Sequence, residues 1–167
     1  MLPASKTAEC FLYLSGQQAE CDLTPLKLQK LLYYAEGLSL ALRGESLFSE
    51  PILAWQYGPV VRDVYKMYEY AGRNSISCIA DIDENDIPED DFNIIKTAMQ
   101  FYGEYSAEKL VQMTHGEYPY TNAQRDQEIN REDMKHFFEE QVHARVAPEI
   151  EDAAFQSLAA ENASSWR

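Results

Sequence analysis

The chain has 167 residues, a length that fits one globular domain, and its 46% hydrophobic and 25% charged residues exclude a disordered or collagen-like chain. Acidic residues outnumber basic ones 28 to 14, giving a formal net charge of −14. Nucleic acid and anionic membranes are therefore excluded as first-choice partners, because phosphate binding needs clustered cations. We expect a basic protein partner instead.

The sequence predicts a cytoplasmic protein. No apolar stretch is long enough to cross a membrane, and the first residues lack the apolar core of a signal peptide. The cysteines, Cys10, Cys21 and Cys78, are odd in number and contain no CxxC motif. This pattern fits neither a disulfide framework nor a zinc site, so we expect reduced, mostly structural thiols.

Helical signals dominate the first half of the chain. Apolar spacing predicts a first helix over residues 5–14. A second helix is predicted from Thr24, a capping residue followed by Pro25, to Gly44, with leucines at three- and four-residue spacing between them. Pro59 is expected to start a third helix, which ends at Gly72.

A minor β element is expected beside these helices. Residues 52–57 are bounded by proline and glycine, and residues 75–82 alternate apolar and polar side chains for part of their length. The two segments are predicted to form a small antiparallel pair.

The second half is also predicted to be helical. Asp86 and Glu89 resemble a capping box on a helix over residues 88–102, Ser106 caps a helix ending near His115, and Asn130 caps another. The fold class expected is mainly α: a single compact helical domain over residues 1–147 with a minor short antiparallel β element. Residues 148–167 are expected to form a weak C-terminal helix or tail.

No residue pattern indicates catalysis or a bound cofactor. The seven carboxylates between Asp81 and Asp91 do not fit a calcium-binding loop, because Asp86 stands where the loop needs glycine and Phe92 where it needs glutamate. The three histidines do not have metal-ligand spacing, and no nucleophile or phosphate-loop motif is present. We expect no enzyme, no metal and no cofactor.

Tyrosine is abundant, with 11 among 167 residues. Its ring adds apolar area and its hydroxyl forms hydrogen bonds, and tyrosine is enriched where proteins meet. For any single tyrosine, the alternative is that its ring lines the edge of a modest core. As a set, the tyrosines favour a binding module over a catalyst.

Residues 23–72 resemble the opening of the Panacea domain, also called the SocA-like antitoxin domain. The matching pieces are KLQKLLYYAEG (27–37), LF (47–48), AWQYGPVVRDVY (54–65), LVQMTHGEYPYTNA (110–123) and, more weakly, INREDMKHFF. The resemblance covers about residues 5–140. Leu38 and Tyr120 stand where the family often has tryptophan.

The resemblance implies a mainly helical antitoxin that neutralises a cognate toxin, encoded by the adjacent gene, through direct protein–protein binding. One member of the family is instead a proteolytic adaptor that delivers its toxin to the protease ClpXP, a AAA+ protease. Under that alternative, the C-terminal segment of this chain would engage the protease or a chaperone.

The resemblance also directs attention to particular side chains. Trp55, Gly58 and Pro59 are expected to be structural, at a turn that redirects the chain. Lys27 and Lys30 form either a buried pair with a carboxylate, such as Glu36 or Asp63, or a partner contact, and His115 either closes its helix or marks the contact surface. The candidate partner-binding residues are Lys27, Lys30, Tyr34, Tyr57, Tyr65, Tyr68 and His115.

Overall fold

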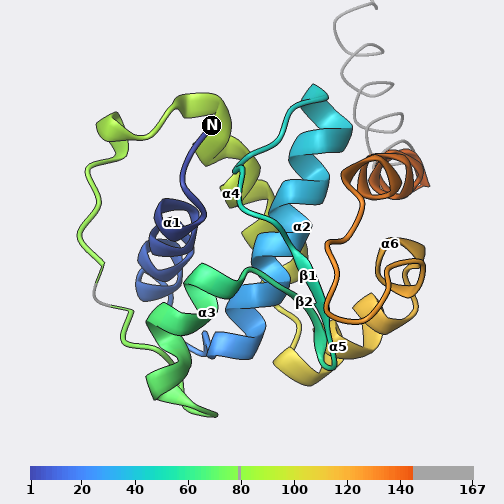
Figure 1. The fold of residues 1–167 in the computed structure, drawn as a ribbon. Coiled ribbons are helices and arrows are strands. Elements are labelled where there is room, and N and C mark those ends of the chain that lie inside the picture. Colours follow the sequence, from blue (N-terminus) through green and yellow to red (C-terminus); the bar gives the residue numbers. More distant parts are fainter. Residues whose placement is uncertain (79, 145–167) are drawn as a thin grey trace, which may run out of the picture.

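The long helix α2 (Pro25–Arg43) forms the centre of the structure (Figure 1). The computed structural model describes residues 1–78 and 80–144. At the start of α2, the backbone N–H of Lys27 donates to the Thr24 hydroxyl at 3.2 Å, and Pro25 takes the first helical position. The helix ends at Gly44, whose φ of 71° is a left-handed conformation that favours glycine. The predicted bounds of this helix are confirmed.

The other helices surround α2 and bury nearly all of its length. Figure 1 shows residues 4–16, 62–78 and 80–86 on one side of α2 and residues 107–144 on the other. The surrounding helices are α1 (Ala4–Gly16), α3 (Arg62–Tyr68), α4 (Glu89–Tyr102), α5 (Ala107–His115), α6 (Tyr118–Thr121) and a last one over residues 131–144, with 3-10 turns η1 (Glu69–Ala71) and η2 (Glu84–Asp86).

Besides the Thr24 cap, two further predicted helix caps are confirmed and one is wrong. The Ser106 hydroxyl accepts from Lys109 N at 3.1 Å, and the Asn130 side chain accepts from Asp133 N at 3.0 Å. The capping box at Asp86 does not form, because Asp86 belongs to η2 and α4 begins only after Pro88, which makes no side-chain cap. The helix α6 was not predicted.

The β element is a hairpin between β1 (Leu53–Trp55) and β2 (Gly58–Val60), with Ala54 opposite Pro59. The predicted pairing with residues 75–82 is wrong. The described part of that segment forms no strand, and Ile76 N donates instead to the Leu23 carbonyl at 2.8 Å. The predicted helix start at Pro59 is also wrong, because Pro59 lies within β2 and α3 begins at Arg62.

Two cysteines are joined, which corrects the expectation of three reduced thiols. The structure pairs Cys21 with Cys78 as a disulfide, with their Cα atoms 6.4 Å apart. This bond ties the connection between α1 and α2 to the segment that follows η1. Cys10 remains a free, buried thiol, and burial raises its pKa to about 11.

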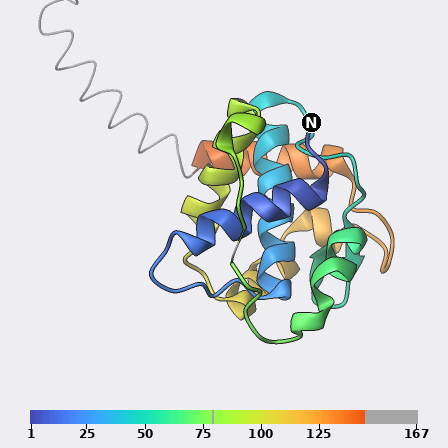
Figure 2. The same cartoon turned by 90° about the vertical axis from the view of Figure 1, so that its left-hand side faces the viewer.

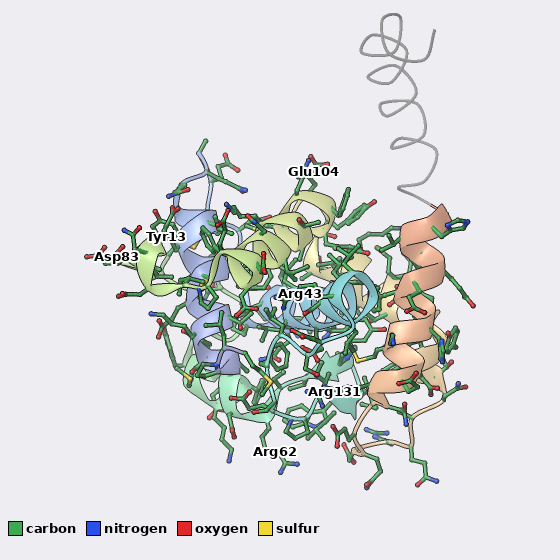
Figure 3. All side chains as sticks on the ribbon, turned by 90° about the horizontal axis from the view of Figure 1, so that it is seen from above. Tyr13, Arg43, Arg62, Asp83, Glu104 and Arg131 are labelled. Atoms are coloured by element: carbon green, nitrogen blue, oxygen red, sulfur yellow. A yellow bond between two sulfur atoms is a disulfide. The ribbon has the colours of Figure 1, made fainter. Side chains whose placement is uncertain are left out.

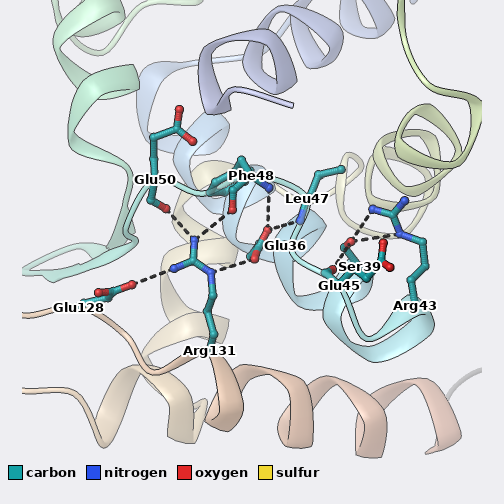
Figure 4. A network of polar contacts seen from close by, with 9 residues as sticks. All are labelled: Glu36, Ser39, Arg43, Glu45, Leu47, Phe48, Glu50, Glu128 and Arg131. Carbon is teal, nitrogen blue, oxygen red and sulfur yellow. Dashed lines mark hydrogen bonds and ion pairs between the residues drawn. The ribbon is translucent and has the colours of Figure 1, made fainter. Parts of the chain in front are cut away.

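A buried ionic network joins α2 to the last described helix (Figure 4). The Glu36 carboxylate is fully buried, accepts from the backbone N–H of Leu47 at 2.8 Å, and pairs with the Arg131 guanidinium at 3.0 Å. Arg131 also donates to the Glu50 carbonyl at 2.7 Å and pairs with Glu128 at 2.8 Å. Because the buried carboxylate has several donors, its charge is compensated inside the fold.

The fold class expected from the sequence, mainly α with a minor antiparallel β element, is confirmed. Among the described residues, no helix combines the length and apolar character needed to cross a membrane. The C-terminal helix or tail predicted over residues 148–167 lies outside the described residues.

Candidate partner-binding surface

Three aromatic side chains, Trp55, Tyr57 and Tyr65, lie at the tip of the β1–β2 hairpin. A two-residue turn, Gln56–Tyr57, connects the strands. Tyr57 is 61% exposed, while Trp55 and Tyr65 are partly buried and meet edge to face with ring centroids 5.1 Å apart. We call Trp55, Gln56, Tyr57, Tyr65 and Arg125 the hairpin-tip surface.

The hairpin can only sit this closely on α2 because residue 58 is glycine. Gly58 has a φ of 106°, and a Cβ there would lie 2.6 Å from Cε of Lys30 and 2.9 Å from the Thr114 hydroxyl. Two side chains of α2 then hold the outgoing strand: Lys30 donates to the Pro59 carbonyl at 3.1 Å, and the Gln29 side chain accepts from Val61 N at 2.7 Å.

Side chains from α5 and α6 hold the tip itself. The Tyr120 hydroxyl donates to the Trp55 carbonyl at 2.6 Å, and Nε2 of His115 lies 3.1 Å from the Gln56 carbonyl oxygen, to which it donates in the tautomer that carries the Nε2 proton. The His115 and Tyr120 rings stack 5.1 Å apart. The exposed rings therefore stand on a backbone that is fixed before any partner arrives.

A second segment braces the first strand. Residues 126–129 run along β1, where Ala54 N donates to the Gln127 carbonyl at 2.9 Å and Asp126 N donates to the Ala54 carbonyl at 2.8 Å. Arg125, just before this segment, reaches the Gln56 side chain at 3.5 Å. A groove of about 260 Å³ lies between Trp55, Tyr120 and Arg125.

Three of the predicted partner-binding residues are buried inside the domain. Lys27 donates to the Asp22 carboxylate at 2.8 Å and to the Gly103 carbonyl at 2.7 Å. Tyr34 stacks on Tyr102 at 3.9 Å and donates to Glu117 at 3.1 Å. These side chains, together with Lys30, hold helices together and do not belong to the accessible surface.

The predicted pairing of a buried lysine with a carboxylate is confirmed for Lys27, but neither Glu36 nor Asp63 is the partner. Lys27 pairs with Asp22, and Glu36 is taken by Arg131. Lys30 is buried between α2 and β2, where it donates to the Pro59 carbonyl, and burial lowers its pKa to about 7.

The remaining predicted residues separate into two places. Tyr57, Tyr65 and His115 lie at the hairpin tip, where Tyr57 is exposed, Tyr65 packs on Trp55, and His115 supports the turn. Tyr68, one helical turn further along α3, lines a groove next to α1. Sequence reasoning missed Tyr120, Gln56 and Arg125. The signal available for Tyr120 was its position in a matched motif, five residues after His115.

The acidic run between residues 81 and 91 shows no metal site. Asp83 caps η2 by accepting from Asn85 N at 3.0 Å, and these bonds lower its pKa. Asp91 is buried and pairs with Arg43 at 2.9 Å. Within residues 1–78 and 80–144, no three metal-binding side chains gather closely enough to hold an ion.

Comparison with known proteins supports the assignment that the sequence suggested. Searches of curated proteins and of solved structures gave no match. Residues 28–121 match the family described as "Antitoxin SocA-like, Panacea domain". This match spans α2, the hairpin, α3, α4, α5 and α6, and includes Tyr57, Tyr65, His115 and Tyr120. Since it covers more than half of the chain, the protein belongs to the SocA-like Panacea-domain family of antitoxins.

Proposed function

We propose that this protein neutralises a cognate toxin, encoded by the adjacent gene, by binding it directly through the hairpin-tip surface. Membership of the antitoxin family carries the functional part of this proposal. The exposed Tyr57 ring on a braced turn supports the choice of surface. A rigid aromatic side chain contributes much to binding because little conformational entropy is lost when it is covered.

In this proposal the protein binds the toxin by contact alone and carries out no chemical step. Tyr57, Trp55 and Tyr65 supply apolar area, and the hydroxyls, Gln56 and Arg125 supply hydrogen bonds at its edge. Such a combination of aromatic anchors and a polar rim is typical of protein interfaces. The encounter is proposed in the cytoplasm. This location is a prediction from the sequence alone. The Cys21–Cys78 disulfide speaks against it, because disulfides are rare in reducing compartments.

The test is growth of cells that express the neighbouring gene, with and without this protein, followed by co-purification of the two products. We expect growth arrest that is relieved together with a stable complex. Tyr57→Ala should weaken the complex by about tenfold or more, the size typical of a central aromatic contact. Phe101→Ala, which removes an exposed ring from α4, is the matched control and should bind as the wild type does.

Two other outcomes would change the conclusion. If the product of the neighbouring gene is harmless alone, the proposed partner is wrong. If Tyr57→Ala binds the toxin as tightly as the wild type does, the proposed surface is wrong. Relief of growth arrest with a falling toxin level and no stable complex would favour the proteolytic adaptor. In that case, deletion of residues 148–167 should preserve toxin binding and stop toxin degradation by a ClpXP-type protease.

A further inference from the structure

A second surface lies on the side of the molecule formed by α1, α3 and residues 76–77 and 80–81. Helix α1 packs against α3, and the chain after η1 passes beside both (Figures 1 and 2). Between them is an open groove of about 430 Å³. We call it the tyrosine–carboxylate groove and define it by Glu9, Leu12, Tyr68, Tyr70, Ile76 and Asp81.

The groove has an apolar floor and a polar, aromatic rim. Leu12 and Ile76 are buried below it, Tyr68 is partly buried, and Tyr70 at the rim is 74% exposed. Burial raises the pKa of Tyr68, and the nearby Glu9 carboxylate and Tyr70 add to the effect. The Tyr68 hydroxyl is therefore neutral and lies within the field of a carboxylate.

The charge around the groove is negative. Asp81 is exposed and takes part in no ion pair within residues 1–78 and 80–144, and Glu9 is held by Lys6 at 3.1 Å through one of its two oxygens. The acidic segment continues along α1, where the Tyr13 hydroxyl donates to Glu84 at 2.9 Å. Figure 3 places Tyr13 and Asp83 together on this side.

This combination of groups selects a cationic side chain on a long aliphatic stem. Tyrosine rings attract ammonium and guanidinium groups, and carboxylates pair with them. An apolar floor suits the methylene stem of lysine or arginine, whose charged end then reaches the rim. Phosphate-bearing ligands are disfavoured by the same carboxylates.

We propose that the tyrosine–carboxylate groove binds an arginine- or lysine-containing segment of a partner protein. The site is separate from the hairpin-tip surface, so it does not depend on that surface being correct. It also does not require the toxin to be known, because a synthetic peptide can serve as the probe.

The test uses the full chain and a fluorescent peptide of alternating arginine and serine, followed by anisotropy at low salt. A peptide with glutamate in place of arginine is the negative probe. We expect Asp81→Asn and Tyr70→Leu each to weaken binding by about three- to fivefold, the range for one exposed ionic or cation–π contact. Tyr70→Phe keeps the ring and should bind within about twofold of the wild type, as a cation–π contact requires.

The control for net charge is Glu140→Gln. It removes the same single charge as Asp81→Asn, and its exposed position is on the helix over residues 131–144, which lies on the opposite side of the molecule from α1 in Figure 3. It should leave binding unchanged. Equal weakening by Asp81→Asn and Glu140→Gln would show only long-range attraction to an acidic protein and would overturn the proposal. Failure of the arginine peptide to bind, or equal loss in Tyr70→Leu and Tyr70→Phe, would overturn it as well.

Discussion

At the scale of single residues, Lys30 is the most unusual group in the chain. Its amine is fully buried at the junction of α2 and the hairpin, where it donates to the Pro59 carbonyl at 3.1 Å and touches Gly58. Transfer of a charged amine into such a place is costly, which is why burial lowers its pKa to about 7. Lys30 thus supports the hairpin-tip surface from below.

The lowered pKa of Lys30 predicts a pH-dependent stability. Because the unfolded chain binds this proton up to the ordinary lysine pKa and the folded chain releases it above about pH 7, the free energy of unfolding should rise with pH. From about pH 7 to about pH 8.5 the rise from this group should be about 1–2 kcal/mol, at about 1.4 kcal/mol per pH unit.

Lys30→Met removes the titrating group and keeps most of the volume, so its free energy of unfolding should lack this rise. Urea unfolding of the two proteins at both pH values measures the difference. Comparing wild type with variant cancels the other titrating groups, including Cys10. Parallel pH profiles for the two proteins would show that Lys30 keeps its ordinary pKa.

Tyr120 stands where the resemblance to the family leads us to expect a tryptophan. Tyrosine and tryptophan both combine an aromatic ring with a hydrogen-bond donor. In this chain the Tyr120 hydroxyl donates to the Trp55 carbonyl and the ring stacks on His115. In this chain, then, a hydrogen-bond donor on an aromatic ring supports the hairpin tip, and a tryptophan also has both features.

At the scale of elements, the helix over residues 131–144 completes the domain although it lies beyond the matched family region. Arg131 pairs with the buried Glu36, and the ring of Phe138 covers Gly37 of α2. Phe138 also meets Tyr33 and Tyr34 edge to face, at 5.5 and 5.8 Å. Gly37 is thus required by the close approach of this helix.

We predict that Gly37→Ala lowers stability by forcing this helix away from α2. A Cβ at residue 37 would lie 2.1 Å from the Phe138 ring, so the ring or the helix must move. The expected loss is about 1–3 kcal/mol, as for other overpacked cores, despite the better helix propensity of alanine. Thermal or urea unfolding measures it.

The double variant Gly37→Ala with Phe138→Leu is the control for this prediction. The smaller side chain leaves room for the methyl group, so the two losses should not add. Additive losses would mean that the alanine acts through something other than contact with Phe138.

Elements with local signals could be predicted from the sequence, and elements set by tertiary contact could not. The bounds of α2 follow from Thr24, Pro25 and Gly44, and Ser106 and Asn130 mark two further helix starts. The hairpin was not predicted, because a glycine followed by a proline is a typical local signal for the start of a helix. In the structure Gly58 and Pro59 belong to β2, where Gly58 fits closely against Lys30 and Thr114.

The candidate site shows the same division. Tyr57 and Tyr65 could be selected by residue type and by their place in a matched motif, and the structure shows Tyr57 exposed and Tyr65 partly buried. Burial of Lys27 and Lys30 was one of the two alternatives that the sequence left open, and Tyr34 was expected at the partner surface; the sequence could not decide, because charged and hydroxyl side chains are buried only where tertiary partners exist. Asp22 lies five residues before Lys27, but the other partners, Gly103, Pro59 and Glu117, come from distant parts of the chain.

At the scale of the whole molecule, the two proposed surfaces lie next to each other along α3. Tyr65 meets Trp55 at the hairpin tip, and Tyr68, one helical turn later, lines the tyrosine–carboxylate groove. A partner that covers α3 can therefore touch aromatic rings on one side and carboxylates on the other. The net charge of −14 attracts such a partner over a distance if it is basic.

This arrangement predicts that salt and Tyr57 act on different rate constants. For a basic toxin, raising the salt concentration from about 20 mM to about 300 mM should slow association by about tenfold, because screening removes long-range attraction but leaves apolar contacts intact. Dissociation should change little with salt. Tyr57→Ala should instead speed dissociation and leave the salt dependence of association as it is in the wild type. Surface-based kinetic measurements at several salt concentrations separate the two effects. An association rate that does not respond to salt would mean that the negative charge of the molecule plays no part in the encounter.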